Sequence, residues 1–169
     1  QLVTPGLQIT QQGSFVQPTI RGVGTTIAGT GADPNVALYI DGVYQASSYA
    51  TLLDFNSISA VEVLKGPQGT LYGRNATGGA IIVKTLDPST DKLSGKLTGS
   101  YGSFKEREID AYINIPVTDS FAINVAALHH NNDGYTENVF LGLDSSQSEA
   151  TAVRVKALFE PTDELRIVA

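Results

Sequence analysis

The chain has 169 residues and a mass of 17.8 kDa, with 41% hydrophobic and 17% charged residues, so it is long enough for one ordinary domain with a sizeable core. It contains no Cys, which excludes disulfide scaffolds, Cys-based zinc sites and thiol catalysis. The net charge of -6 and the sequence pI of about 4.7 argue against a surface that neutralises nucleic-acid phosphates, so we expect no nucleic-acid partner.

The first half of the chain is rich in turn residues. Residues 1–92 hold 12 of the 17 Gly and 5 of the 7 Pro. Asp41-Gly42 lies between two short β-rich runs, which predicts a hairpin within residues 36–44. Residues 58–65 are predicted to form a strand, and residues 66–73 a compact turn region. We interpret this half as a small mixed α/β domain with Gly-supported tight turns.

A change of composition marks a boundary near residues 87–93. Beyond residue 92 the chain carries 11 of its 17 acidic side chains. Apolar and polar residues alternate there with period two, which predicts β-strands with two different faces. We expect five strands, which begin near Leu93, Arg107, Phe121, Val153 and Leu165.

The predicted strands are joined by connections of unequal length. Residues 103–106, 117–120 and 160–164 form short links, whereas residues 131–149 form a long polar loop. Strands of about ten residues with this pattern of turns are typical of an outer-membrane β-barrel. In a barrel, Lys96, Arg154 and Lys156 face a wet lumen, and Ile109, Ile113, Val153 and Val155 face lipid. The alternation fits a soluble antiparallel sheet equally well, so periodicity alone does not decide.

Three ordered segments of the first half resemble the plug domain of TonB-dependent outer-membrane receptors. They are Ile20-Arg21-Gly22, the run from Val36 to Val43, and the run from Ile58 to Val83. The resemblance implies a small mixed α/β plug at residues 1–87, a connector at residues 88–92, and the first four to five antiparallel strands of a transmembrane β-barrel at residues 93–169. In this family a plug fills a barrel of roughly 22 strands. Together with the absence of Met, this leads us to expect a fragment.

The resemblance also implies a function without bond-making chemistry and without a cofactor. It implies energised uptake of a scarce, bulky nutrient across the bacterial outer membrane, with the plug changing conformation to open a path. A ferric siderophore is the default ligand, and haem, cobalamin and oligosaccharide are alternatives. The implied partners are TonB with its inner-membrane energising complex, outer-membrane lipid, and a small-molecule or metal-chelate ligand.

Two basic residues match plug positions where the family places positive charge against carboxylates of the barrel wall. They are Arg21, in the Ile-Arg-Gly segment, and Lys65, which precedes Gly66-Pro67. Such pairs imply a lock between plug and barrel, because a buried charge needs a partner. The alternative is that both are solvated surface charges. Arg is frequent in the family where this chain has Lys65, and Lys lacks the bidentate fork of Arg.

Two loops match the plug apices that the family directs toward its ligand. They are the loop Gly24–Pro34 and the stretch Gln45–Tyr49. Hydroxyl groups on these loops are candidate ligand contacts, although ordinary turn chemistry explains each of them as well: Thr25, Thr26, Thr30, Ser47, Ser48 and Tyr49. In the long loop of the second half, Tyr135, Glu137 and Asn138 are further candidates for the external binding surface.

Other chemistry finds little support in the sequence. His129 and His130 are adjacent in a predicted strand, so their side chains point to opposite faces and cannot chelate one ion together. The spacing of residues 129–140 resembles that of a calcium loop. Its first position is His129 and its twelfth is Phe140, whereas a calcium loop needs an acidic residue at each. The glycine-rich stretch 66–79 contains no phosphate-binding motif.

Two functions from other classes remain as alternatives. A secreted, soluble β-rich binding module would close its own core, whereas a receptor fragment leaves an unpaired sheet edge. Expression of residues 93–169 alone separates the two, because a monomeric and cooperatively folded product would count against the barrel. An enzyme would need a nucleophile, a base and an orienting group, and the sequence does not group them.

Overall fold

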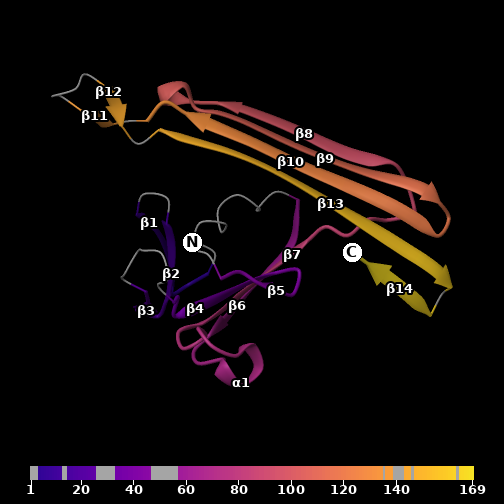
Figure 1. Ribbon diagram of the computed structural model, residues 1–169, viewed down its shortest axis with the longest axis horizontal. Coiled ribbons are helices and arrows are strands. Elements are labelled where there is room, and N and C mark those ends of the chain that lie inside the picture. The colour runs from indigo at the N-terminus through magenta and orange to yellow at the C-terminus, as the bar shows by residue number, and fades with distance from the viewer. Residues whose placement is uncertain are drawn as a thin grey trace. The chain divides into compact units, whose positions relative to one another are not determined.

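The computed structural model describes residues 4–12, 15–25, 33–46, 57–134, 136–138, 143–145, 147–162 and 164–169. The chain divides into two compact units, residues 1–85 and residues 86–169, and Figure 1 labels the strands of each. Among the described residues, no helix is long and apolar enough to cross a membrane.

The first unit contains a small antiparallel sheet of β1 (Leu7–Gln12), β2 (Phe15–Ile20) and β3 (Val23–Gly24). Arg21 and Gly22 form the turn between β2 and β3, with φ angles of 50° and 82°. Two consecutive positive φ angles are typical of a type I′ turn, whose twist matches that of the flanking strands.

A second sheet in the first unit contains β4 (Val36–Ile40), β5 (Val43–Tyr44), β6 (Ile58–Lys65) and β7 (Gly79–Thr85) in the order β5-β4-β7-β6. The β4–β7 pair is parallel, whereas β5 and β6 pair antiparallel with their neighbours (Figure 1). The Asp41-Gly42 turn joins β4 and β5 with φ angles of 48° and 82°. The predicted hairpin and the predicted strand at residues 58–65 are therefore confirmed.

One four-residue helix, α1 (Gly69–Tyr72), lies in the segment predicted as a compact turn region. The first unit is thus a small mixed α/β domain, as expected. Among the described residues of this unit the helix is a single turn, with Gly66 and Gly73 on either side at positive φ angles of 94° and 68°.

Both faces of the β4–β7 pair are buried. The core of the first unit therefore consists of two clusters, one on each face. The larger cluster contains Ile20, Val36, Leu38, Ile40, Ile81 and Val83. The smaller cluster contains Ala37, Ala76 and Ala80, against which Tyr39, Tyr44, Leu64 and Tyr72 pack. The three small residues leave room for rings, and the Tyr39 ring lies 5.6 Å from that of Tyr44 and 5.3 Å from that of Tyr72, centroid to centroid. Both pairs are tilted or edge-on, as aromatic quadrupoles prefer.

The second unit is built on one five-stranded antiparallel sheet in the order β14-β13-β10-β9-β8 (Figure 1). Its strands are β8 (Ser94–Tyr101), β9 (Arg107–Thr118), β10 (Phe121–Asn132), β13 (Ser148–Thr162) and β14 (Leu165–Val168). All five predicted strands are present, although β13 begins at Ser148 and not near Val153. Each pairs with its neighbour in sequence within the sheet.

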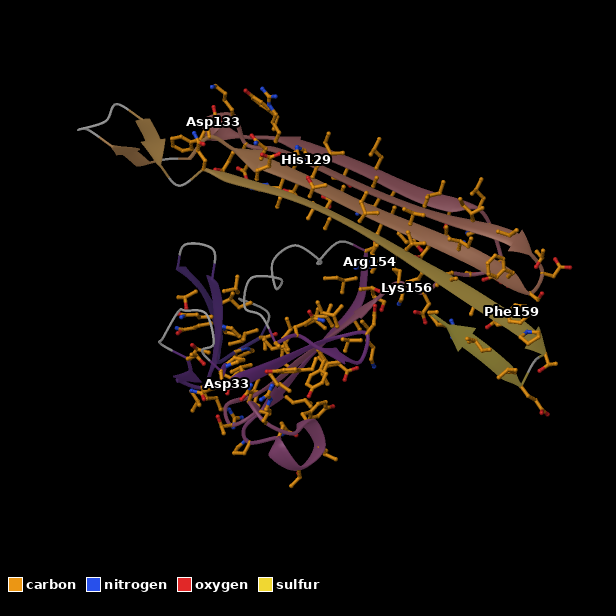
Figure 2. All side chains as sticks on the ribbon, viewed as in Figure 1. Asp33, His129, Asp133, Arg154, Lys156 and Phe159 are labelled. Carbon is orange, nitrogen blue, oxygen red and sulfur yellow. The ribbon has the colours of Figure 1, made fainter. Side chains whose placement is uncertain are left out.

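The two faces of this sheet are inverted relative to a soluble sheet. Apolar side chains at odd-numbered positions are exposed, for example Ile109 at 53% and Val153 at 67%. On β9, β10 and β13, polar side chains at even-numbered positions are buried, such as Asn114 at 2% and Lys156 at 8%, beside the apolar Ala122 and Leu158. A soluble antiparallel sheet normally packs its apolar face on a core and leaves its polar face in water. Figure 2 shows Arg154 and Lys156 along β13 of this sheet.

The connections differ from the prediction in one place. Residues 131–149 were expected to form a long polar loop, but pairing of β10 with β13 continues through Asn132 and Ser148. A short hairpin of β11 (Thr136–Asn138) and β12 (Leu143–Ser145) follows beyond it. The prediction was wrong here because backbone hydrogen bonds extend a ladder without any need for apolar alternation.

The short link 103–106 contains a 3-10 turn, η2 (Ser103–Lys105), in which Phe104 and Lys105 have positive φ angles of 57° and 54°. Lys105 Nζ lies 2.6 Å from Asp133 Oδ2, which ties this turn to the end of β10. In Figure 2, His129 and Asp133 lie toward this end of the sheet and Phe159 lies toward the opposite end.

Candidate functional site

The loop Gly24–Pro34 is closed at its base by hydrogen bonds between residues on either side of it. The Asn35 amide N–H donates to Thr25 Oγ1 at 2.7 Å, and Asn35 Nδ2 donates to the Gly24 carbonyl at 3.0 Å. The Asn35 carbonyl in turn accepts from the Gly78 N–H at 2.8 Å. Asn35 therefore joins both ends of this loop to the start of β7.

Asn75 links the bases of the two loops that were predicted to face a ligand. Its Nδ2 donates to Asp33 Oδ1 at 3.1 Å and to the Tyr44 hydroxyl at 2.7 Å. Asp33 is the second-to-last residue of the first loop, and Tyr44 immediately precedes the stretch Gln45–Tyr49. One amide group thus holds both loop bases, and Figure 2 labels Asp33 within this part of the first unit.

Tyr39, Tyr44 and Tyr72, here called the tyrosine cluster, pack at the same end of the sheet. The Tyr39 hydroxyl donates to the Tyr72 carbonyl at 2.6 Å, which fixes the last residue of α1. Tyr39 is the register partner of Tyr44 across the β4–β5 pair. The two loops therefore leave a base that is held by aromatic packing and by four polar side chains, Thr25, Asp33, Asn35 and Asn75.

The predicted ligand contacts are described only in part. Thr25 is half-buried, and its hydroxyl accepts the Asn35 N–H, so it closes the loop. The remaining predicted contacts lie outside the described residues: Thr26, Thr30, Ser47, Ser48, Tyr49 and Tyr135. Glu137 and Asn138 belong to β11, and the structure describes their backbone only. The ligand role of all these residues stays a prediction.

The two predicted lock residues lie in different parts of the first unit. Arg21 is exposed at the β2–β3 turn, where its N–H donates to the Gly6 carbonyl at 2.7 Å. Lys65 is half-buried at the end of β6, opposite Gly79 in the register. Neither side chain forms an ion pair with another described residue, so the lock stays a prediction.

A different lysine of the first unit is paired. Lys84 Nζ lies 2.7 Å from Glu62 Oε1 across the β6–β7 pair, and both side chains are about half exposed, at 56% and 48%. The hydrogen bond to the Glu62 carboxylate and its negative charge raise the pKa of Lys84 above its ordinary value. This pair lies on the solvated surface of the sheet and has no direct contact with the loop bases among the interactions of the described chain.

The two histidines of β10 occupy opposite faces, as the alternation predicts. His129 is exposed, and its Nδ1 lies 2.9 Å from Thr151 Oγ1 on β13. His130 is half-buried on the other face, where its Nε2 lies 3.4 Å from Asn132 Nδ2. Within the described part of the chain, no group of three or more His, Asp or Glu side chains could hold a metal ion.

Sequence reasoning did not single out Asn35 or Asn75. One sequence signal for Asn75 was its place in a Gly-rich stretch, since Asn tolerates the left-handed region better than most residues. Its φ is indeed 68°. Its partners lie 31 and 42 residues away in the chain, so no local pattern could identify them.

A family model and curated relatives both match this chain. A family model described as the TonB-dependent Receptor Plug Domain matches residues 1–80. The pesticin receptor of Yersinia pestis is 33% identical over 164 residues, which cover 96% of this chain and 24% of that protein. The catecholate siderophore receptor Fiu of Escherichia coli is 35% identical over 103 residues, which cover 60% of this chain and 13% of that protein.

Solved structures agree with these relatives. The crystal structure of the ferric yersiniabactin uptake receptor FyuA from Yersinia pestis is 32% identical with a TM-score of 0.82, and the match covers 95% of this chain and 26% of that one. The copper transporter OprC has a TM-score of 0.73 at 17% identity, which shows the fold alone. The chain thus spans about a quarter of the length of the curated relatives that match nearly all of it.

Proposed function

Because the chain belongs to the family of TonB-dependent receptors, we propose that it forms the plug and the first wall strands of a bacterial outer-membrane receptor that takes up a ferric siderophore. In this proposal the plug comprises residues 1–87, the connector residues 88–92, and the barrel wall begins at residue 93. The partners are TonB with its inner-membrane complex, outer-membrane lipid and the ferric ligand.

The observation that carries the membrane assignment is the inverted sheet of the second unit. Its exposed face carries Leu97 at 77%, Val153 at 67% and Val155 at 59% exposure. Such a face is unfavourable in water, since each exposed apolar residue forgoes about 1.5–3 kcal/mol of burial. The same face is stable against hydrocarbon, where a barrel wall places apolar side chains outward and polar ones inward.

The siderophore assignment draws on the relatives. Two of them are named as a ferric yersiniabactin uptake receptor and a catecholate siderophore receptor, and a third is named a hemin receptor. The ligand of this receptor is therefore proposed as an iron chelate, with a ferric siderophore ahead of haem. Cobalamin and oligosaccharide have no named relative among these proteins.

The first unit supplies the parts that such a receptor needs for gating. Its two loops leave a common base at Asn75, so a ligand that contacts both loop tips acts on one cross-linked element. A ligand shifts a conformational equilibrium only through contacts that differ between the two states. Arg21 and Lys65 are proposed to pair with carboxylates of the barrel wall, which would hold the plug in its closed state.

The proposal is tested with cells that lack their own siderophore receptors and express the receptor that contains residues 1–169. Accumulation of radiolabelled iron is measured with ferric yersiniabactin, a ferric catecholate siderophore, haem and ferric citrate supplied separately. We expect accumulation with one siderophore class and none in cells that carry an empty vector. Equal, low accumulation with every iron source would contradict the proposal.

A further inference from the structure

The first residues of the second unit are held by side chains of the sheet that follows them. Residues 86–92, here called the linker, contain no regular secondary structure. Four polar side chains of the five-stranded sheet contact the linker. Three of them come from the inner strands of the sheet: Asn114 of β9, Asn124 of β10 and Lys156 of β13. Asn124 is the direct register partner of both others, so the three form one continuous row across the sheet.

The side-chain amide of Asn114 bonds the backbone of Ser89 as a neighbouring strand would. Its Oδ1 accepts the Ser89 N–H at 2.8 Å, and its Nδ2 donates to the Ser89 carbonyl at 2.9 Å and to the Lys92 carbonyl at 3.0 Å. The Asn114 side chain is 2% exposed, so these bonds are shielded from water. Loss of the side chain would leave buried backbone groups of the linker without partners, which is costly.

The other two members of the row hold the beginning of the linker. Asn124 Nδ2 donates to the Leu86 carbonyl at 2.8 Å, and Lys156 Nζ lies 2.8 Å from Asp87 Oδ1. The Lys156 side chain is only 10% exposed, so its charge requires a partner at this place. Arg166 of β14 approaches the second oxygen of Asp87 at 3.3 Å.

The residue before the linker is held by its own unit. The Thr85 N–H and hydroxyl donate to the two oxygens of the Asp41 carboxylate, at 2.8 and 2.6 Å. Thr85 and Leu86 are consecutive, and each has an anchoring contact. Each unit therefore holds its own end of the Thr85–Leu86 peptide bond.

We propose that Asn114, Asn124 and Lys156 form an anchoring site for the linker that stays closed while the receptor transports its ligand, so that movement of the plug ends at Leu86. The role in transport rests on the proposed function, whereas the site itself rests on the contacts above. A released linker of seven residues could span at most about 23 Å when fully extended. That span is close to the height of the apolar band of a barrel, about 25 Å, so the anchor limits how far the end of the plug can move.

Hydrogen exchange followed by mass spectrometry tests the site in the complete receptor in detergent micelles. In the parent protein, peptides covering residues 86–92 should show a protected amide at Ser89. Asn114→Ala should speed its exchange at least about tenfold, since a tenfold change corresponds to the loss of one or two hydrogen bonds. Asn124→Ala should speed exchange across the same peptide to a smaller extent.

Two matched variants serve as controls. Asn132→Ala removes an asparagine from the same face of β10 as Asn124, and Lys96→Met removes an exposed lysine from the same face of β8. Both should leave exchange of residues 86–92 unchanged. Peptides covering residues 111–117 should stay protected in every variant, which shows that the sheet is folded. Rapid exchange of Ser89 in the parent, or unchanged exchange in both Asn variants, would overturn the proposal.

A cross-link tests whether the site stays closed during transport. The 169 residues contain no Cys, so Ser89→Cys together with Asn114→Cys can be joined by a short thiol-reactive cross-linker. We expect the cross-linked receptor to take up iron at least as fast as the same double variant without cross-linker, and loss of uptake on cross-linking would overturn a closed anchor. If the parent itself takes up no iron chelate while Ser89 is protected as described, the proposed function fails and the anchoring site stands.

Discussion

Asn75 shows how a single side chain can organise two loops. Its amide reaches Asp33 and Tyr44, and its backbone adopts a φ of 68°. A residue other than Gly in this region carries a strain of the order of 1 kcal/mol, which Asn bears better than most. The two hydrogen bonds offset that strain, so both the side chain and the backbone of this position are specified by the fold.

Substitution of Asn75 separates these two contributions. Asn75→Ala removes both hydrogen bonds and keeps a strained backbone, and we expect it to destabilise the first unit by about 2–4 kcal/mol. Asn75→Gly removes the same bonds but relieves the strain, so it should cost about 1 kcal/mol less. The stability of each variant is measured by denaturant-dependent hydrogen exchange at the Asn35 amide of the receptor. Equal stability of both variants and the parent would show that the loop bases do not depend on Asn75.

The Asp41–Thr85 contact offers a second test at the scale of residues. Thr85→Val keeps the shape of the side chain but removes the hydroxyl that donates to Asp41 Oδ2 at 2.6 Å. Hydrogen bonds to charged groups contribute about 1.5–3 kcal/mol, so the free energy of unfolding should fall by about that amount. Thr77→Val is a suitable control, because the Thr77 hydroxyl makes only long contacts of 3.4 and 3.5 Å to Asn35. A loss no larger than that of the control would mean that Thr85 is held by its backbone alone.

At the scale of elements, local signals were sufficient for most strands. Asp41-Gly42 fixes its hairpin through its own turn geometry, and the strand at residues 58–65 was predicted with its observed bounds. The extension of β10 and β13 through residues 131–132 and 148–149 was missed, since cross-strand backbone pairing has no signature in either segment alone. The side chains that bind the linker were missed for the same reason, because a row such as Asn114–Asn124–Lys156 exists only once the strands are in register.

Two adjacent residues of β8 test which face of the sheet meets lipid. Leu97 and Thr98 are both exposed and lie on opposite faces. In a membrane-spanning wall, Leu97→Arg should destabilise the folded receptor by about 2–4 kcal/mol, whereas Thr98→Arg should change its stability by less than about 0.5 kcal/mol. The measurement is denaturant-dependent folding into lipid vesicles. Two small and equal effects would be the behaviour of a soluble sheet, in which both positions face water.

Gly79 provides a further test of the plug sheet. It begins β7 with a φ of 143°, and a Cβ atom there would collide with the Leu64 carbonyl oxygen and meet Ile20 Cδ1 at 2.8 Å. Gly79→Ala should therefore separate β6 from β7 and lower the stability of the first unit by about 3 kcal/mol or more. Gly69→Ala is the matched control, because a Cβ at Gly69 meets nothing within 4 Å and Ala favours the helical turn. The melting temperature of each variant checks this, and two equal temperatures would contradict it.

On the scale of the whole molecule, the chain combines a domain with a buried core on both sides of its sheet and a wall that exposes its apolar face. The resemblance identified from three segments of the first half is confirmed by the match of residues 1–80 and by the relatives that cover nearly the whole chain. The loops predicted to contact the ligand share a base at Asn75, and the linker is fixed to the wall.

The most direct test of the account is to compare ligand binding and ligand accumulation in cells with and without TonB. Cells that express the receptor are incubated with the radiolabelled ferric siderophore selected by the uptake assay, and surface-bound and internal iron are measured over time. We expect cells without TonB to bind the siderophore at the surface as well as cells with TonB but to accumulate no internal iron. Accumulation at the same rate in both cells would contradict it.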